Sequence, residues 1–400
     1  MTEAISGPLS GPLSGLKVLD LTRLLPGPVA TMHLADLGAD VTKIEGDGAA
    51  GDYARSMGYG ASATEDSYYF RMVNRNKRSL KLDLKRPEGV AVFMRLAQDA
   101  DVIVEGFRPG VTDKLGIGYD AIKAINPRIV YCAITGYGQT GPWAAKAGHD
   151  LNYIATAGLL DQIGTAGDAP AIPNLQVGDL LGGALTPLLG LLAAVIGAKT
   201  TGRGSFVDVA MTDALFAHMV FPLSTILEHG HSMPRGTDLL NGGVPCYSVY
   251  RTSDARYLAV GALETKFWQE FCRVIARPDL ALLGIATGAD GERVRGEVAA
   301  VIAAQTLAYW DQVFAVTDCC VTPVLTLDEA LVHAQRMARD MVIEIGGVKQ
   351  YAPPFKLSTW PWDSKLSRPA PKVGADGTAI LQAAGYSDAE ISRLQAAGIV

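Results

Sequence analysis

The fold is constrained most strongly by a series of short apolar segments in the first third of the chain. Five of them have the length and composition of β-strands: 16–22, 40–45, 79–84, 101–107 and 129–138. Helices are predicted between Pro28 and Gly38 and at 87–98. Strands that alternate with helices form parallel sheets, because each helix carries the chain back to the same end of the sheet. We therefore predict an α/β fold with a Rossmann-like parallel sheet that continues to about residue 210.

The pattern changes near residue 235, where strands and helices no longer alternate in this way. Residues 242–263 contain two short strands joined by a polar turn, which is typical of an antiparallel hairpin. Helical patterns follow before α/β character returns around residue 320. We predict two domains: a large α/β domain built from residues 1–225 and 331–400, and a smaller inserted α+β domain at 226–330.

Residues 180–198 form an uncharged run that is long enough to cross a lipid bilayer. The run contains four glycines and Pro187, and no belt of aromatic residues flanks it. We therefore expect a helix that is buried on all sides within the large domain, and no association with a membrane.

The composition excludes several classes of protein. Hydrophobic residues make up 48% of the chain and charged residues 19%, as in globular proteins, and the net charge of −6 argues against binding to nucleic acid. The five cysteines contain no C-x-x-C pair, so neither a disulfide framework nor a metal site is predicted. The first strand is followed by RLLPGPVA rather than the dinucleotide motif G-x-G-x-x-G. No secretory signal is recognised at the start, and a cytoplasmic location is expected.

Four ionisable residues stand in surroundings that suggest a function. His149 and Asp150 lie in a segment of mostly small and apolar residues, and Asp179 precedes the uncharged run. Glu264 follows a predicted strand and precedes a predicted helix. Each has a structural alternative: a core histidine bonded to backbone, an N-cap aspartate, or an acid in the first turn of a helix. Spacing alone does not decide between these roles and proton transfer.

Long motifs along nearly the whole chain resemble one known family. They are GADVTKIE, NRNKRSLKLDLK, DVIVEGFRPGVTDKLGIGYD, AITGYGQTGP, AGHDLNYIATAG, VGDLLGG and YLAVGALE. Together they are similar to the family III CoA-transferase superfamily, and AGHDLNY and GALE resemble its α-methylacyl-CoA racemase branch. The resemblance implies an acyl-CoA substrate, with coenzyme A as part of that substrate and no prosthetic group.

In the racemase branch a histidine and an aspartate face each other across the acyl α-carbon. By resemblance these residues are His149 and Asp179, and Glu264 is the carboxylate that pairs with the histidine. A racemase removes a proton from one face of a carbon and returns one to the other, so it needs acid–base groups on opposite sides. Histidine as a residue type titrates near neutral pH, and a carboxylate partner stabilises its charged form.

The expected intermediate is a thioester enolate, whose oxygen gains negative charge. The resemblance assigns its stabilisation to the backbone N–H of Asp150, and it places Asn152 and Tyr153 along the pocket. The expected role of Asp179 contains a conflict, because a helix N-terminus lowers the pKa of an acid whereas a proton acceptor needs a higher one. We expect desolvation by the acyl pocket to raise the pKa again.

Coenzyme A carries a diphosphate and a 3′-phosphate, and the chain has a basic segment that suits them. Residues 71–108 contain nine Lys or Arg and five Asp or Glu, a local balance of +4. A solvated helix face explains part of this excess, but arginine also binds phosphate in a bidentate manner. The resemblance implies these CoA-binding residues: Lys43, Arg75, Arg78, Arg108, Gly136, Tyr137, Gly138 and Tyr153.

Two other functions use the same scaffold. In a CoA-transferase of this superfamily, the aspartate at position 179 is a nucleophile that forms an acyl anhydride and then an aspartyl-CoA thioester. The presence of both His149 and Glu264 favours racemisation, and the full set argues against a non-catalytic acyl-CoA-binding protein. The resemblance also implies an interlocked homodimer, in which Glu264 reaches His149 of the partner subunit.

Overall fold

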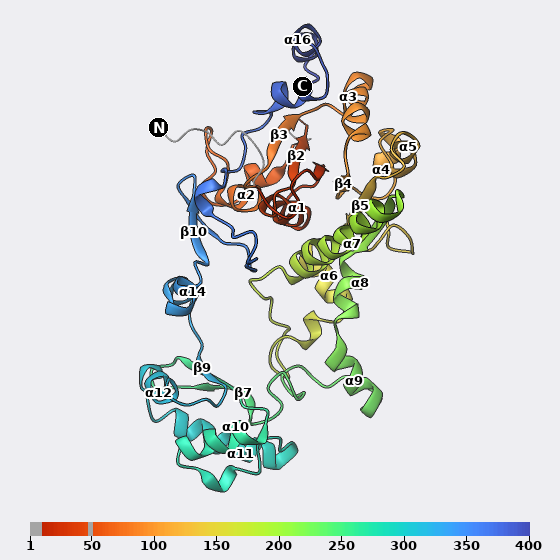
Figure 1. Ribbon diagram of the computed structural model, residues 1–400. Helices are drawn as coiled ribbons and strands as arrows, with labels where there is room; N and C mark the ends of the chain where they lie inside the picture. The colour runs from red at the N-terminus through yellow and green to blue at the C-terminus, as the bar shows by residue number, and fades with distance from the viewer. Residues whose placement is uncertain (1–9, 47–50) are drawn as a thin grey trace. The chain divides into compact units, whose positions relative to one another are not determined.

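The computed structural model describes residues 10–46 and 51–400, which form two compact units (Figure 1). The first unit contains the described residues up to Ala157, together with Leu175–Phe216 and Gln335–Val400. The second contains Gly158–Asn174 and Ala217–Ala334. The predicted domains, 1–225 with 331–400 and 226–330, remain a proposal about which parts of the chain fold together.

A parallel sheet forms the centre of the first unit and confirms the predicted α/β fold. Its strands are β1 (Lys17–Asp20), β2 (Asp40–Glu45), β3 (Arg78–Lys81), β4 (Val102–Glu105), β5 (Val130–Thr135) and β6 (Ser205–Ala210). The six strands lie in the order β3-β2-β1-β4-β5-β6, which is the Rossmann-type order with its reversal between β1 and β4. All five predicted strands are present, and β6 is a further strand that the sequence analysis missed.

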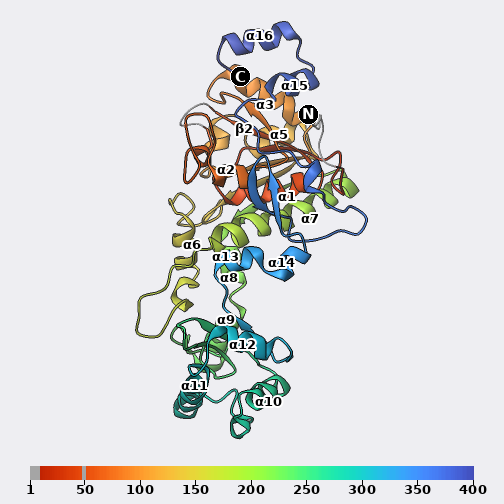
Figure 2. The same ribbon diagram turned by 90° about the vertical axis from the view of Figure 1, so that its left-hand side faces the viewer.

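Helices cover both faces of this sheet. They are α1 (Pro26–Asp36), α2 (Tyr68–Val73), α3 (Pro87–Gln98), α4 (Val111–Lys114), α5 (Tyr119–Ile125), α6 (Asp150–Thr156), α7 (Thr186–Thr201), α8 (Met211–Ala217), α15 (Gly377–Ala383) and α16 (Asp388–Ala396). Figure 2 shows α3, α5 and α16 on one side of the sheet and α1 and α7 on the other. One core cluster joins Phe93 of α3, Ile103 of β4 and Leu381 of α15, so the carboxyl-terminal helices complete a core begun near the amino terminus.

The carboxyl-terminal part of the first unit also contains an antiparallel pair of strands, β10 (Val342–Ile345) and β11 (Val348–Tyr351). The short helix α14 (Ala334–Ala338) precedes them. Single 3-10 turns lie at Tyr53–Arg55, Leu160–Gln162, Pro278–Leu280 and Ser364–Leu366.

The second unit is built on an antiparallel sheet of three strands. Its elements are α9 (Val220–His229), β7 (Tyr247–Arg251), β8 (Tyr257–Gly261), α10 (Thr265–Val274), α11 (Gly288–Ile302), α12 (Leu307–Phe314), β9 (Val321–Pro323) and α13 (Leu327–Val332). Strands β7 and β8 form the predicted hairpin. Trp268, Phe271 and Trp310 are buried in a core of its own, as an α+β unit requires.

The uncharged run forms a π-helical segment, η4 (Gly178–Leu185), that continues directly into α7. By length and composition, Gly178–Thr201 could cross a membrane. The prediction that this helix is buried on all sides is wrong, since Leu189 is 73% exposed and Ile196 64% exposed. Only one face, which includes Leu191 and Val195, is buried within the unit. Hydropathy alone does not tell whether the chain itself or another molecule covers an apolar face.

Candidate active site

A cavity of about 450 Å³ opens at the carboxyl ends of β1, β4 and β5. Residues that directly follow these strands line it, among them Thr22 after β1, Phe107 after β4 and Gly136 after β5. The strand order reverses between β1 and β4, so the connections from these two strands diverge and leave a crevice between them. The cavity therefore lies where doubly wound sheets bind their ligands, and all of its lining residues belong to the first unit.

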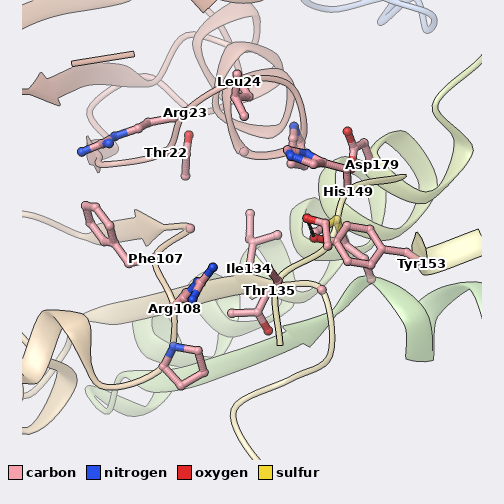
Figure 3. A pocket seen from close by; sticks show the side chains of 18 of the residues that line it. Thr22, Arg23, Leu24, Phe107, Arg108, Ile134, Thr135, His149, Tyr153 and Asp179 are labelled. Carbon is pink, nitrogen blue, oxygen red and sulfur yellow. Dashed lines mark hydrogen bonds between the residues drawn. The ribbon is translucent and has the colours of Figure 1, made fainter. Parts of the chain in front are cut away.

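The lining residues differ in chemistry from one end of the cavity to the other. In Figure 3, His149, Tyr153 and Asp179 lie toward one end, and Arg23 and Arg108 lie toward the other. The first end carries ionisable groups and the second carries fixed positive charge. A long ligand with an anionic part and a distant reactive carbon suits such a division.

Asp179 is the second residue of η4, and its backbone N–H donates to Asp150 Oδ1 at 3.0 Å. Val177 is the N-cap residue of this helix, so Asp179 does not have the N-cap role that was considered as its structural alternative. Burial and, in second place, the nearby Asp150 carboxylate raise the pKa of Asp179 to about 7. Desolvation thus outweighs the helix N-terminus, as the sequence analysis expected of an acyl pocket.

His149 and Asp150 lie at the start of α6, where His149 is the N-cap residue. The His149 backbone N–H donates to Asn152 Oδ1 at 3.1 Å, which fixes the entry of the chain into the helix. The exposed imidazole of His149 lines the cavity. Asp150 is the first residue of the helix, so no residue within α6 can accept its backbone N–H. Asn152, which was predicted along the pocket, acts here as a cap.

Gly136 of the predicted CoA-binding set makes room for an aromatic ring. A Cβ atom at Gly136 would lie 2.2 Å from the Tyr153 ring, so only glycine permits the buried position of Tyr153. The Tyr137 and Tyr153 ring centroids are 5.5 Å apart in an edge-to-face arrangement. Among the described residues, Gly136 and Tyr153 line the cavity, whereas Tyr137 and Gly138 do not. Burial, followed by the Asp179 charge, raises the pKa of Tyr153 to about 12.

The cavity contains three cationic side chains, of which only one was predicted. Arg108, the predicted one, is exposed on the loop after β4. Arg23 follows β1, and its guanidinium carbon lies 5.4 Å from the centre of the Phe107 ring and 5.9 Å from that of Tyr53. Lys146 lies over the Trp143 ring at 3.4 Å. The sequence analysis missed Arg23 and Lys146.

Lys43 is fully buried and contacts the loop that carries Arg23. Its Nζ donates to the Thr22 carbonyl at 2.8 Å and pairs with Asp52 Oδ2 at 2.8 Å. Asp52 in turn accepts the Leu24 backbone N–H at 3.0 Å. Leu24 has a φ of +64°, a left-handed conformation that needs such support in a residue with a branched side chain. Lys43 and Asp52 thus hold the loop in place, and the predicted contact of Lys43 with CoA stays a prediction.

Two of the predicted arginines, Arg75 and Arg78, also have partners inside the chain. Arg75 is 2% exposed and pairs with Asp36 at 2.6 Å. Arg78 pairs with Asp40 at 2.6 Å and is partly exposed. Among the described residues that line the cavity, neither arginine is found. Their predicted contacts with CoA stay predictions.

Glu264 belongs to the second unit, where it precedes α10 as the N-cap residue. Its backbone carbonyl accepts hydrogen bonds from Phe267 and Trp268, in the first turn of that helix. The predicted pairing of its carboxylate with a histidine stays a prediction.

The chain is similar to known proteins over nearly its whole length. Residues 13–377 match CoA-transferase family III. Human α-methylacyl-CoA racemase is 35% identical to this chain, over 97% of each protein. Human succinyl-CoA:glutarate CoA-transferase is 32% identical, over 97% of this chain and 90% of that protein. The crystal structure of a CAIB/BAIF family protein from Brucella suis matches with a TM-score of 0.81 and 29% identity, over 94% of this chain and 100% of that one.

Proposed function

The chain belongs to CoA-transferase family III, and from that membership we propose that it is a racemase of 2-methylacyl-CoA thioesters. The observation that carries the proposal is that an imidazole and a carboxyl group, His149 and Asp179, line one cavity. The similarity to human α-methylacyl-CoA racemase supports it. Coenzyme A enters as part of the substrate, and the reaction needs no prosthetic group.

In the proposed reaction, one proton is removed from the α-carbon and one proton is added to its opposite face. For one epimer, the Asp179 carboxylate takes the α-proton, the C–H electron pair forms the enolate, and the protonated His149 returns a proton to the other face. For the opposite epimer the two groups exchange roles. An acid whose pKa is about 7, as for Asp179, gives and takes protons with similar ease at neutral pH.

The enolate oxygen needs a hydrogen-bond donor that is already in place when charge develops. The backbone N–H of Asp150 is proposed for this role, because it lies at the N-terminus of α6 beside His149. The partial positive charge of a helix N-terminus favours an oxyanion there. Glu264 is proposed as the carboxylate that stabilises the imidazolium.

The cationic end of the cavity is proposed to bind the phosphates of CoA. Arg108 and Arg23 are supported by their place at this end of the cavity, and Lys146 also lines the cavity. Guanidinium groups suit phosphate oxygens because they donate two parallel hydrogen bonds. We assign the main contacts to these side chains rather than to Lys43 or Arg75, which are buried against carboxylates.

The alternative function is CoA transfer between carboxylic acids through an aspartyl-CoA thioester on Asp179. The similarity to human succinyl-CoA:glutarate CoA-transferase supports it. A carboxyl nucleophile must be ionised before it attacks. With a pKa of about 7, Asp179 is ionised in only part of the population at neutral pH, and since a proton acceptor must be ionised as well, this pKa does not distinguish the two reactions.

Incubation of a single epimer of a 2-methylacyl-CoA with the enzyme in D₂O should give deuterium at the α-carbon and both epimers. The reason is that the removed proton mixes with solvent on at least one of the two acid–base groups. Mass spectrometry and chiral analysis of the acyl group measure both outcomes, and no acceptor acid is added. Label that enters only with a second carboxylic acid, together with an Asp179 adduct trapped by hydroxylamine, would instead identify a transferase.

We further propose that the protein is a cytoplasmic homodimer. Leu189 and Ile196 on α7 are exposed in the first unit, as are Phe221 and Leu227 on α9 in the second. Apolar side chains gathered in this way mark surfaces that another molecule covers. A second copy of the chain is the proposed occupant in both cases.

The double substitution Leu189→Asp and Ile196→Asp should convert the dimer to a monomer. Two carboxylates would have to be desolvated in an apolar interface, and we expect the dimer dissociation constant to rise at least about 100-fold. Light scattering coupled to size exclusion measures this change. Leu282→Asp, which changes a leucine that is 83% exposed in the second unit, is the matched control. A wild-type chain that is monomeric at micromolar concentration would refute the dimer.

A further inference from the structure

The Asp150 side chain joins the segments that carry the two proposed proton-exchanging residues. Asp150 directly follows His149 in the chain. Its Oδ1 accepts the backbone N–H of Asp179 at 3.0 Å, across a sequence separation of 29 residues. The same oxygen lies 2.9 Å from the position that a Cβ atom would occupy at Gly178. Glycine at 178 therefore permits the close approach of this carboxylate to the start of η4.

The helix that carries Asp179 has no other polar side chain at its cap position. Val177 is the N-cap residue, and a valine side chain cannot accept a hydrogen bond. The first N–H groups of a helix need acceptors from outside it, and a carboxylate is the acceptor that the helix dipole favours. Asp150 supplies such an acceptor from α6, and this leaves the Asp179 side chain free to line the cavity.

The same residue also acts at the start of α6. The backbone N–H of Asp150 is the proposed donor to the enolate, and the preceding His149 is fixed by Asn152. One residue therefore connects the oxyanion site, the imidazole segment and the carboxyl segment.

We propose that the Asp150 side chain is a positioning residue: it caps the helix that carries Asp179 and fixes the spacing between Asp179 and His149. The inference rests on the proposed racemase function, because spacing between these groups matters only if both exchange protons with one carbon. Displacement of such a group by about 1 Å costs about 100-fold in rate.

The charge of Asp150 also affects the pKa of Asp179. A measurement of that pKa can therefore distinguish the proposed role from a purely structural one. The ionisable groups near Asp179 are Asp150 and Tyr153 on α6, Tyr69 on α2, and His149. The cations Arg23, Arg108 and Lys146 line the same cavity. After burial, the Asp150 charge is the cause that raises the pKa of Asp179. Removing this charge while keeping an oxygen acceptor should therefore lower that pKa.

The test compares Asp150→Asn with Asp150→Ala. The asparagine keeps an oxygen that accepts the Asp179 N–H but removes the charge, and the alanine removes both. We expect Asp150→Ala to lose about 100-fold in kcat, and Asp150→Asn to retain a kcat at least about tenfold above that of the alanine variant. In Asp150→Asn, the limb of the pH–rate profile that belongs to Asp179 should move down by about one pH unit. It is the acidic limb for one epimer and the alkaline limb for the other, because Asp179 exchanges its role.

A second measurement does not depend on turnover. In protein labelled with ¹³C-aspartate, the carboxyl signal that disappears in Asp179→Asn reports the titration of Asp179 itself. Its midpoint should fall in Asp150→Asn by the same pH interval as the kinetic limb. An unchanged midpoint, or an alanine variant as active as the wild type, would overturn the inference. A wild-type enzyme that exchanges no α-proton but shows the shifted midpoint would refute the racemase proposal and leave the positioning role of Asp150 intact.

Discussion

Replacement of His149 by alanine should lower the rate of α-proton exchange by about 10³-fold and leave the affinity for CoA within about threefold of wild type. The imidazole lines one end of the cavity, whereas Arg23 and Arg108 lie toward the other end (Figure 3). Its loss removes one acid–base group and no phosphate contact. Deuterium incorporation measures the rate, and isothermal titration with CoA measures the affinity.

Two variants make this experiment decisive. His231→Ala changes an exposed histidine of the second unit and should leave both quantities unchanged. Asp179→Asn should abolish exchange as well, because the opposite face then lacks its acid–base group. If His149→Ala instead loses CoA binding or unfolds, the residue is structural and the racemase proposal fails. If the wild type itself exchanges no α-proton but transfers CoA to an added acid, the enzyme is a transferase.

Replacement of Asp20 by alanine should lower the free energy of unfolding by about 3–5 kcal/mol. Asp20 lies at the end of β1, fully buried, and pairs with the buried Lys77 at 3.0 Å. It also accepts hydrogen bonds from the hydroxyls of Thr22 and Thr31. The alanine leaves a buried ammonium group and two hydroxyls without this partner. Urea denaturation followed by circular dichroism measures the change, and Asp20→Asn, which keeps the shape, should show a smaller loss.

The pH dependence of stability should distinguish this effect from loss of packing. Burial opposes ionisation of Asp20, but Lys77, Lys43 and the two hydroxyls together hold its pKa below the ordinary 3.8. A carboxyl with a lowered pKa stabilises the fold above its ordinary pKa and loses that contribution as the pH falls through the folded-state value. The difference between wild type and Asp20→Asn should therefore be full at pH 7 and shrink only below about pH 4.

A surface ion pair provides the comparison. Glu270 pairs with Arg273 on α10, where both side chains are partly or largely exposed, and Glu270→Ala should cost less than about 1 kcal/mol. Equal losses for Asp20→Ala and Glu270→Ala would contradict the role assigned to the buried pair.

The sheet was predictable because its signal is local. Each strand is an apolar run bounded by turn residues, and α3 begins at Pro87, a residue favoured in the first turn of a helix. The rule that such connections cross over in one hand limits the possible strand orders but does not select one. Strand β6 was missed because part of it is exposed, so its residues do not form the continuous apolar run of a buried parallel strand.

The ion-pair partners of the basic residues were not predictable from composition. Arg75 meets Asp36 across 39 positions of the sequence, and Arg78 meets Asp40 across 38. The second pairing depends on the register in which β2 and β3 lie side by side, and a count of charges contains no register. An excess of Lys and Arg suggested a phosphate site. Arg75 and Arg78 are paired with carboxylates of the same unit, and their contacts with CoA stay predictions.

The presence of His149 and Asp179 in one cavity was predictable, and the cationic end was predictable only in part. His149 and Asp179 belong to motifs that the family resemblance identifies. Arg23 could also have been found, because it follows β1 at the carboxyl end of a parallel strand, next to the reversal of strand order. Lys146 lies in an irregular loop, and no local pattern distinguishes it from other surface lysines.

Because η4 is π-helical, the number of residues in this segment determines the direction of the Asp179 side chain. The hydrogen bonds of a π-helix join residues five apart, one more than in an α-helix. Deleting a single residue between Leu181 and Leu185 would let the segment rewind as an ordinary helix, in which each residue turns the axis by about 100°. Asp179 would then point away from the cavity although no side chain of the site had been altered. We expect a one-residue insertion or deletion here to remove the proposed activity as a substitution of Asp179 would.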